Sequence, residues 1–244
     1  MLEVRGLTKS FGALRACDGI DFDVTEGETH AVIGPNGAGK TTFISQLAGN
    51  LLPDAGTVRF AGEDITTLPA PKRARKGLAR SFQITSVYPE FSALDNVALA
   101  VQARSGHSFR FWRPARGDAS LASPAMQVLE QVGLKERSHV LAANLSHGEQ
   151  RQLEVAMALA TEPRLLLLDE PMAGMGTEES QRMIALLSRL KQSKTIILVE
   201  HDMDAVFRLA DRISVLVYGR VIATDTPEKI RAHTEVRRAY LGED

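Results

Sequence analysis

Alternating polar and apolar residues mark the first third of the chain as rich in β-strands. Gly19–Val24 and Thr57–Phe60 place an apolar side chain at every second position. A strand with one buried face and one exposed face has this spacing. Glycines separate these runs and supply the turns between them. The pattern predicts an antiparallel sheet in this part of the chain.

Three continuous apolar runs in the last third predict strands of another kind. They are Leu165–Asp169, Thr195–Val199 and Ile213–Val217. Runs that are apolar at every position are typical of parallel strands covered on both faces. Between the first two runs lies Met183–Leu190, where apolar residues recur at the spacing of one helix face. This alternation of buried strands and amphipathic helices indicates an α/β fold.

The middle of the chain, roughly residues 86–160, lacks strand alternation and has helical spacing. We therefore predict a single domain over residues 1–244. Its α/β core comprises residues 1–85 and 161–244 and includes the antiparallel β subdomain. A helical subdomain, residues 86–160, is inserted into this core.

Composition and charge narrow the function classes. The chain has 244 residues with a net charge of -1. This balance argues against a nucleic-acid partner, since a non-specific DNA binder carries a marked basic excess. The single cysteine, Cys17, excludes an internal disulfide and suits a reducing compartment. Charges at the start of the chain argue against a signal peptide, and the apolar runs are too short to span a bilayer. Work at a membrane would therefore require docking onto a spanning partner.

The most specific motif is GPNGAGKTT, which runs from Gly34 to Thr42. It lies between the apolar run Thr29–Ile33 and a stretch with helical spacing, so the order is strand, loop, helix. The glycines allow backbone N–H groups to point at phosphate oxygens. Lys40 can reach the β- and γ-phosphates, and the Thr41 hydroxyl can ligate Mg²⁺. The motif predicts a site for ATP and Mg²⁺.

Polar side chains follow two of the predicted parallel strands. Asp169 and Glu170 end one strand, and His201 follows the next one. Active groups in open α/β sheets collect at this edge. Asp169 suits Mg²⁺ coordination beside Thr41. Glu170 suits accepting a proton from an attacking water, and His201 suits holding the γ-phosphate or orienting that water. The alternatives are that the acidic pair caps the next helix and that the histidine is structural.

A helix is predicted to begin at Ser146, and its first turn has two interpretations. Ser146 with Glu149 three residues later forms a capping box. Alternatively, Ser146 and Gly148 present a helix N-terminus to a phosphate. Because this helix is far from the phosphate loop in sequence, that phosphate would belong to a nucleotide on another copy of the protein.

Taken together, these motifs resemble the ATP-binding subunits of ATP-binding-cassette transporters over essentially the whole chain. LSHGEQ, which starts at Leu145, resembles the family signature. The resemblance implies an ATPase in which two copies face head to tail, each ATP lying between one phosphate loop and the partner's signature. It implies Thr41, Gln83 and Asp169 as Mg²⁺ ligands and Glu170 and His201 as catalytic residues. The nucleotide contacts that it implies are Phe11, Gly34, Asn36, Gly37, Ala38, Gly39, Lys40, Thr41, Thr42, Gln83, Ser146, Gly148 and Glu149.

The sequence departs from the family pattern in three places. His147 replaces a glycine of the signature and Glu149 replaces a glutamine. Gly176 stands where the loop that crosses the dimer usually carries an aspartate. We expect the ATP contacts to survive these changes, while communication between the two sites differs.

Within the family, the chain is similar to importers of branched-chain and other hydrophobic amino acids. The segments that carry this similarity include LARSFQ, EPMAGM and the ending RRAYLGED. The resemblance implies a second ATPase subunit, identical or related, as well as transmembrane permease subunits and, indirectly, a periplasmic or extracellular substrate-binding protein. It also implies a peripheral location on the cytoplasmic side of the inner membrane. Urea importers and lipopolysaccharide exporters have similar ATPases and remain alternatives.

Two other classes of phosphate-loop protein also remain open. A soluble cassette ATPase of DNA repair usually has a long coiled coil within the cassette, and one of translation usually has a second cassette; the sequence shows neither feature. A small-molecule kinase would have no use for LSHGEQ or His201. A basic and aromatic segment, Ser105–Gly117, is either a solvated surface or a contact with lipid headgroups or a partner.

Overall fold

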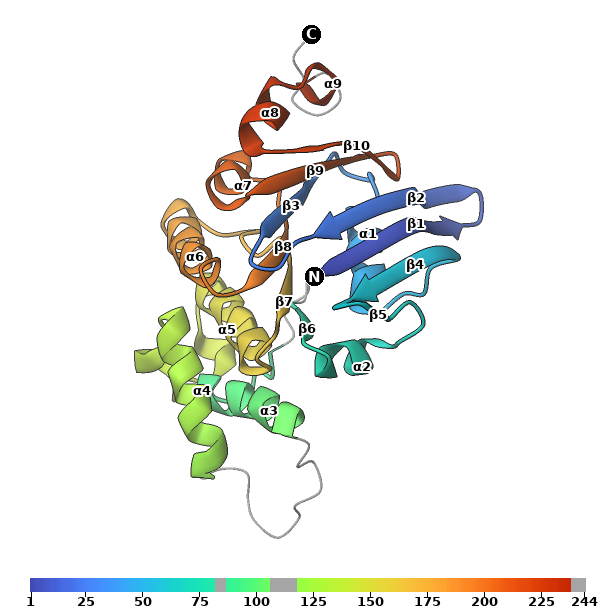
Figure 1. Ribbon diagram of the computed structural model, residues 1–244. Helices are drawn as coiled ribbons and strands as arrows, with labels where there is room; N and C mark the ends of the chain where they lie inside the picture. The colour runs from blue at the N-terminus through green and yellow to red at the C-terminus, as the bar shows by residue number, and fades with distance from the viewer. Residues whose placement is uncertain (82–86, 106–117, 238–244) are drawn as a thin grey trace.

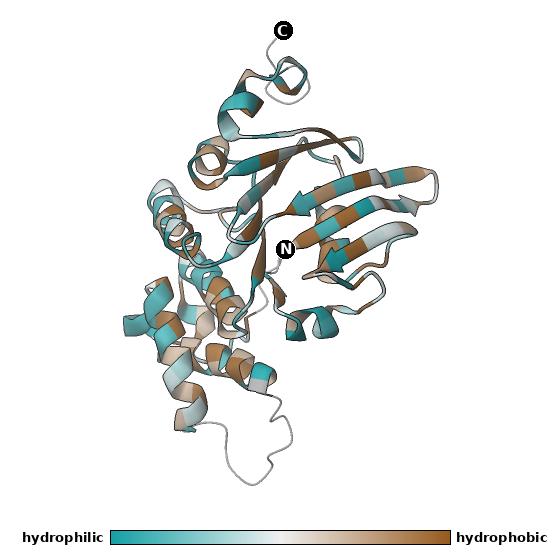
Figure 2. Cartoon of the chain, in the orientation of Figure 1, coloured by the Kyte–Doolittle hydropathy of each residue, from teal (hydrophilic) through white to brown (hydrophobic). Residues whose placement is uncertain are grey.

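The computed structural model describes residues 1–81, 87–105 and 118–237. Its first sheet is antiparallel and has the strand order β2-β1-β4-β5 (Figure 1). β1 pairs antiparallel with β2 and with β4, which confirms the prediction from the sequence, and hydrophilic and hydrophobic residues alternate along β1 and β2 (Figure 2). The bounds of its strands are Leu2–Phe11 for β1, Leu14–Val24 for β2, Ala55–Phe60 for β4 and Glu63–Asp64 for β5.

The second sheet has six strands in the order β10-β9-β3-β8-β7-β6. Its strands are parallel except β10, which pairs antiparallel with β9. The predicted runs are confirmed as β3, β7, β8 and β9, and all five residues of each of the first three are buried. The bounds are Thr29–Ile33 for β3, Leu78–Arg80 for β6, Leu165–Asp169 for β7, Thr195–Val199 for β8, Arg212–Val217 for β9 and Arg220–Asp225 for β10.

Helix α1 (Lys40–Ala48) packs between the two sheets (Figure 1). Phe43 and Leu47 are buried in one cluster with residues of the antiparallel sheet and with Leu165 of β7. The other face of the parallel sheet is covered by helices that include α5 (His147–Ala160) and α6 (Thr177–Leu190). The parallel sheet is therefore packed on both faces, and this packing fixes the position of the phosphate loop at its edge. The other helices near the sheets are α2 (Ala70–Arg75), α6 (Thr177–Leu190), α7 (Met203–Leu209), α8 (Pro227–Ala232) and α9 (Thr234–Val236).

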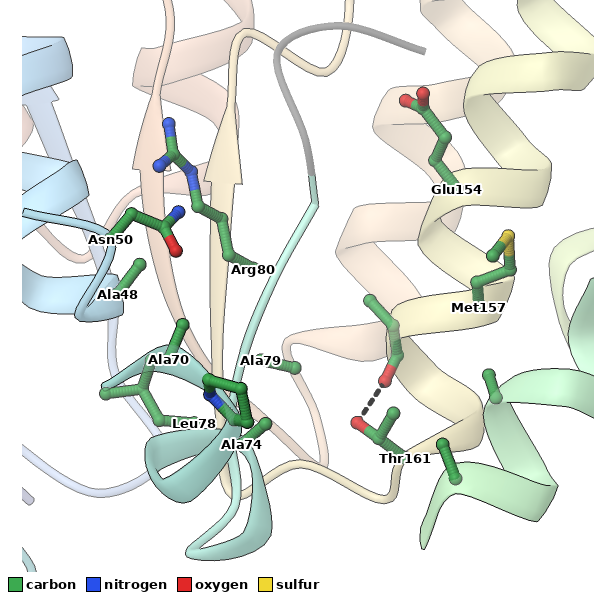
Figure 3. Close-up of a pocket in the computed structure, with 14 residues that line it drawn as sticks. Ala48, Asn50, Ala70, Ala74, Leu78, Ala79, Arg80, Glu154, Met157 and Thr161 are labelled. Carbon is green, nitrogen blue, oxygen red and sulfur yellow. Dashed lines mark hydrogen bonds between the residues drawn. The ribbon is translucent and has the colours of Figure 1, made fainter. Parts of the chain in front are cut away.

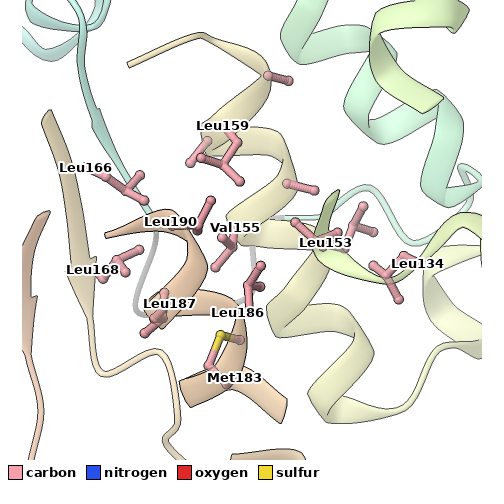
Figure 4. Close-up of a cluster of buried hydrophobic side chains, with 14 of the residues drawn as sticks. Leu134, Leu153, Val155, Leu159, Leu166, Leu168, Met183, Leu186, Leu187 and Leu190 are labelled. Atoms are coloured by element: carbon pink, nitrogen blue, oxygen red, sulfur yellow. The ribbon is translucent and has the colours of Figure 1, made fainter. Parts of the chain in front are cut away.

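Helices also fill the described part of the stretch predicted to be helical. They are α3 (Ala93–Ser105), α4 (Ala119–Val132), two 3₁₀ turns (Lys135–Arg137 and Ala142–Asn144) and α5 (His147–Ala160). Their apolar side chains share one cluster with α6 and β7 (Figure 4). The division into subdomains stays a prediction. Among the described residues, no helix is both long and apolar enough to cross a membrane.

A candidate nucleotide site at the carboxyl edge of the parallel sheet

The phosphate loop connects β3 to α1, as predicted. Gly39 caps α1 with φ 104°, and Gly34 has φ 153°. A Cβ at Gly34 would lie 2.0 Å from the Leu216 carbonyl oxygen, and one at Gly39 would lie 2.1 Å from that of Ala16. Glycine is therefore required at both positions by left-handed backbone and by close packing on neighbouring strands.

Lys40 lies inside this loop rather than in solvent. It is 6% exposed, and its Nζ donates to the carbonyl oxygens of Gly34 at 2.7 Å and Pro35 at 3.0 Å. Burial lowers the pKa of Lys40, while the nearby negative charges of Glu170 and Asp169 act in the opposite direction. The loop thus holds a desolvated ammonium group ready for a phosphate.

A cavity of about 590 Å³ opens over the loop and brings most of the predicted nucleotide residues together. Leu14 and Ala16 of β2 also line it, and they were not predicted, because strand alternation does not indicate which hairpin approaches the loop. Phe11 and Leu14 are large apolar side chains that are 51% and 67% exposed at the rim. The full lining is Phe11, Leu14, Ala16, Asn36, Gly37, Ala38, Gly39, Lys40, Thr41, Thr42, Glu170 and His201.

Glu170 and His201 both line this cavity and contact each other. Nε2 of His201 lies 2.7 Å from Oε1 of Glu170. The two residues follow β7 and β8, which are neighbours in the parallel sheet. Glu170 has φ 52°, a left-handed backbone conformation that is uncommon for residues other than glycine. The helix that follows this loop, α6, is capped by Gly176, so Asp169 and Glu170 are not its caps.

Asp169 has the features of a Mg²⁺ ligand. It is 1% exposed, and its Oδ2 accepts a hydrogen bond from Arg80 at 2.7 Å. Its Oδ1 is buried without a hydrogen-bond partner in the described part of the chain. A carboxylate oxygen and the Thr41 hydroxyl are donors that Mg²⁺ accepts, so the residues fit that ion. Gln83, the third predicted ligand, lies outside the described residues.

The signature residues lie apart from this cavity. Ser146 caps α5, and both hydrogen bonds of the predicted capping box with Glu149 are present. Glu149 also forms an ion pair with Arg137 at 2.9 Å. Neither residue lines the cavity over the phosphate loop, so the structure does not bring them together with the loop of their own chain.

A second cavity of about 170 Å³ lies at the start of α5, and the carboxylate of Glu179 faces it. Oγ of Ser146 lies 3.3 Å from Oε1 of Glu179. A Cβ at Gly148 would lie 2.6 Å from that same oxygen, so the glycine gives the carboxylate room. His147, which departs from the family pattern, packs against the loop at Gly174: a Cβ on that glycine would lie 3.2 Å from the ring.

A known protein family matches the part of the chain that contains the phosphate loop and the signature. A family model described as "ABC transporter" matches residues 17–173. The chain belongs to the ABC transporter family. It is an ATPase of the cassette type, which excludes the small-molecule kinase considered from the sequence. A second model, described as "Branched-chain amino acid ATP-binding cassette transporter", matches residues 220–244.

Individual relatives match the cassette from end to end. It is 40% identical to the high-affinity branched-chain amino acid transport ATP-binding protein BraF of Pseudomonas aeruginosa, with 100% of this chain and 98% of the relative covered. It is 37% identical to the corresponding LivG protein of Escherichia coli K12, with the same coverage. The solved ADP conformation of MJ1267, an ATP-binding cassette of an ABC transporter, has a TM-score of 0.87 at 27% identity, covering 100% of this chain and 99% of that chain.

Proposed function

We propose that this cassette hydrolyses ATP to power the import of branched-chain or related hydrophobic amino acids. The proposal is based on two matches, one over the whole chain and one confined to its C-terminal residues. BraF and LivG are similar over the full length, and the C-terminal residues 220–244 match a model described for branched-chain amino acid transporters. Residues outside the general cassette motifs thus point to the same substrate class as the whole chain.

ATP binds in the cavity over the phosphate loop. Lys40 exchanges its carbonyl partners for phosphate oxygens, and the main-chain N–H groups of the loop hold the remaining oxygens. Thr41 and Asp169 would hold Mg²⁺, with Gln83 as the expected third ligand, and the ion would supply positive charge to the phosphates. Phe11 stacks on the adenine at the rim.

Hydrolysis takes place beside the Glu170–His201 pair. Glu170 accepts a proton from water as the water oxygen bonds to the γ-phosphorus and the bond to the ADP oxygen breaks. His201 lies 2.7 Å from the Glu170 carboxylate, so it holds that carboxylate in place, and it lines the cavity in which the transferred phosphate would lie. The products are ADP and inorganic phosphate.

The signature serves the nucleotide of a second cassette, either an identical copy or a related chain. Ser146 and Gly148 lie outside the cavity of their own phosphate loop. The start of α5 carries the positive end of a helix dipole, which favours a γ-phosphate supplied from outside. ATP therefore joins two cassettes, and hydrolysis removes the phosphate that joins them.

A permease subunit docks on an apolar cavity of about 370 Å³ between β6 and α5. Figure 3 shows Arg80 on one wall and Glu154 and Met157 on the other. The predicted contact segment 84–91 is described only from residue 87; there Tyr88 is 55% exposed and Phe91 38% exposed. We infer a peripheral position on the cytoplasmic side of the inner membrane, with a substrate-binding protein acting on the other side through the permease. Segment Ser105–Gly117 lies almost wholly outside the described residues, and its role is left open.

The proposal is tested in cells that lack this gene, by measuring uptake of labelled leucine and labelled urea. The wild-type chain should restore leucine uptake, and Glu170→Gln should not. Restoration of urea uptake alone, or a defect in lipopolysaccharide export instead, would assign the cassette to one of the alternative transporters. If the chain restores neither leucine nor urea uptake and its loss leaves lipopolysaccharide export unchanged, the result would favour a soluble cassette ATPase.

The ATP-dependent dimer is tested on purified protein. Glu170→Gln keeps the shape of the side chain but loses the base, so ATP stays bound. Gel filtration of this variant should show a dimer with ATP and a monomer with ADP. Adding Ser146→Arg should abolish the dimer by obstructing the approach of phosphate to α5. Persistence of the dimer in the double variant would contradict the role of the signature.

A further inference from the structure

The carboxylate of Glu200 joins the two loops that carry the catalytic pair. Glu200 follows β8 directly and is 4% exposed. Its Oε1 accepts a hydrogen bond from the main-chain N–H of Met172 at 2.8 Å. Its Oε2 accepts one from the main-chain N–H of His201 at 3.0 Å.

These contacts lie next to the reacting groups. Met172 is two residues after Glu170 on the loop that follows β7. The N–H of Glu170 itself donates to the Val199 carbonyl oxygen at 2.9 Å, so the first three residues of this loop are held at two points by the end of β8. With φ 52°, Glu170 has a backbone conformation that persists only where its surroundings hold it. Glu200 supplies part of that restraint.

A carboxylate suits this position better than its neutral amide. Both oxygens of Glu200 face N–H donors, and an ionised carboxylate has acceptors only. In Glu200→Gln, one oxygen becomes an NH₂ group that faces an N–H donor. A buried donor would then lack an acceptor, and one loop would lose its tie to the other.

We infer that Glu200 is a positioning residue for ATP hydrolysis, which holds the loops after β7 and β8 so that Glu170 and His201 meet. This inference rests on the proposed catalytic roles of that pair. Glu200 does not line the nucleotide cavity, so it acts through the pair and not on ATP. Its loss should therefore lower turnover and leave nucleotide binding intact.

The first test separates kcat from KM. We expect Glu200→Gln to lower kcat at least tenfold and to change the KM for ATP less than twofold, since the phosphate loop is untouched. In a His201→Ala background, Glu200→Gln should cause little further loss, because the contact that it protects is already absent. A loss of kcat that multiplies fully in the double variant would overturn the inference.

The matched control is Glu28→Gln. Glu28 is also a buried carboxylate that accepts a main-chain N–H, from Thr25 at 2.7 Å, but it precedes β3 at the opposite edge of the same sheet. A similar loss of stability is expected for this variant, without the tenfold loss of kcat. If Glu28→Gln lowers kcat as much as Glu200→Gln, the effect is one of general stability and the inference fails.

The second test does not depend on hydrolysis. Hydrogen–deuterium exchange at the amides of Met172 and His201 should become at least tenfold faster in Glu200→Gln, and the imidazole ¹⁵N resonances of His201 should shift. If Glu200→Gln does not fold, Glu200→Asp, which is one methylene shorter, should lose the protection of one of these amides. Unchanged exchange at both overturns the inference. Normal turnover in Glu170→Gln would instead refute the proposed base, whatever the exchange shows.

Discussion

The guanidinium of Arg80 donates a hydrogen bond of 2.7 Å to Oδ2 of Asp169 and leaves the buried Oδ1 of that carboxylate without a described partner. The same guanidinium donates to Oγ of Ser45 in α1 at 3.2 Å. Arg80 thus balances part of the charge of Asp169 and leaves Oδ1 as the oxygen for the proposed Mg²⁺. It does so from the strand that borders the apolar cavity between β6 and α5.

Arg80→Met should therefore change how strongly Mg²⁺ stabilises the fold. Removing one partner of a buried ion pair costs about 3–5 kcal/mol, because the other charge is left uncompensated. Mg²⁺ with ATP would then compensate Asp169 in place of the guanidinium. The rise in Tm on adding Mg²⁺ and ATP should be larger in Arg80→Met than in the wild type, and Arg80→Lys should lie between them. An equal rise in all three proteins would show that Arg80 does not influence the metal site.

Glu179 should oppose ATP-dependent association. Its carboxylate lies 3.3 Å from Ser146 Oγ and against Gly148, where the partner's γ-phosphate is proposed to dock. Two anions at one helix N-terminus repel each other. In the Glu170→Gln background, Glu179→Gln should lower the ATP concentration needed for dimerisation several-fold. The control is Glu178→Gln, an exposed residue in the same turn of α6 whose carboxylate pairs with Arg182. A higher ATP requirement for Glu179→Gln would assign its carboxylate a supporting role.

Glu28 and Glu200 should give opposite pH dependences of stability. Burial favours the neutral form of Glu28, but the contact with His30 at 3.1 Å, the hydrogen bond from the main-chain N–H of Thr25 and the charge of Arg212 outweigh it and lower the pKa. Burial raises the pKa of Glu200, assisted by the charge of Glu170 and opposed by main-chain hydrogen bonds.

The sign of each effect follows from linkage. The contribution of Glu28 is complete above its ordinary pKa of 4.5 and is lost as the pH falls through the lower pKa of the folded state. Glu200 does the reverse: the free energy of unfolding falls as the pH rises above 4.5 toward the higher pKa of the folded state. In urea titrations, acidification from about pH 7 to 4.5 should increase the stability of the wild type relative to Glu200→Gln. The difference in the free energy of unfolding between the wild type and Glu28→Gln should change only below about pH 4.5.

Local patterns were sufficient to predict the elements that carry the motifs. The mostly apolar runs gave the bounds of β3, β7 and β8 to the residue, because strands buried on both faces carry few polar side chains. The phosphate loop was equally local, since its glycines are required by its own backbone. By contrast, β6 has three residues, too few for a periodic signal.

The groups that surround the site could not be predicted in this way. Arg80 and Asp169 are 89 residues apart in sequence and meet only because β6 and β7 pair. In the sequence, Glu200 is simply the residue after β8, and nothing there indicates its contact with the main-chain N–H of Met172. Leu14 enters the cavity because the β1–β2 hairpin folds over the phosphate loop. The first two contacts depend on strand order and the third on how the hairpin packs against the loop, and hydrophobic periodicity determines neither.

Phe11 is an exposed aromatic residue at the rim of the proposed nucleotide site. It pairs with Leu14 across the turn of the β1–β2 hairpin, and both side chains line the cavity. Nζ of Lys9 lies 5.9 Å from the centre of its ring. Stacking on a base contributes roughly 1–3 kcal/mol, so Phe11→Ala should raise the KM for ATP at least several-fold and leave kcat nearly unchanged.

Two control variants separate stacking from apolar contact. Phe11→Tyr keeps the ring and should bind ATP like the wild type. Leu14→Ala removes a comparable exposed apolar side chain from the same rim and should have a smaller effect, because an aliphatic group cannot stack on the purine. The KM for GTP should rise in parallel in Phe11→Ala, since stacking does not distinguish between purines. An unchanged KM for ATP in Phe11→Ala, with a lowered Tm, would assign the ring to the stability of the hairpin and leave the adenine to another part of the cavity.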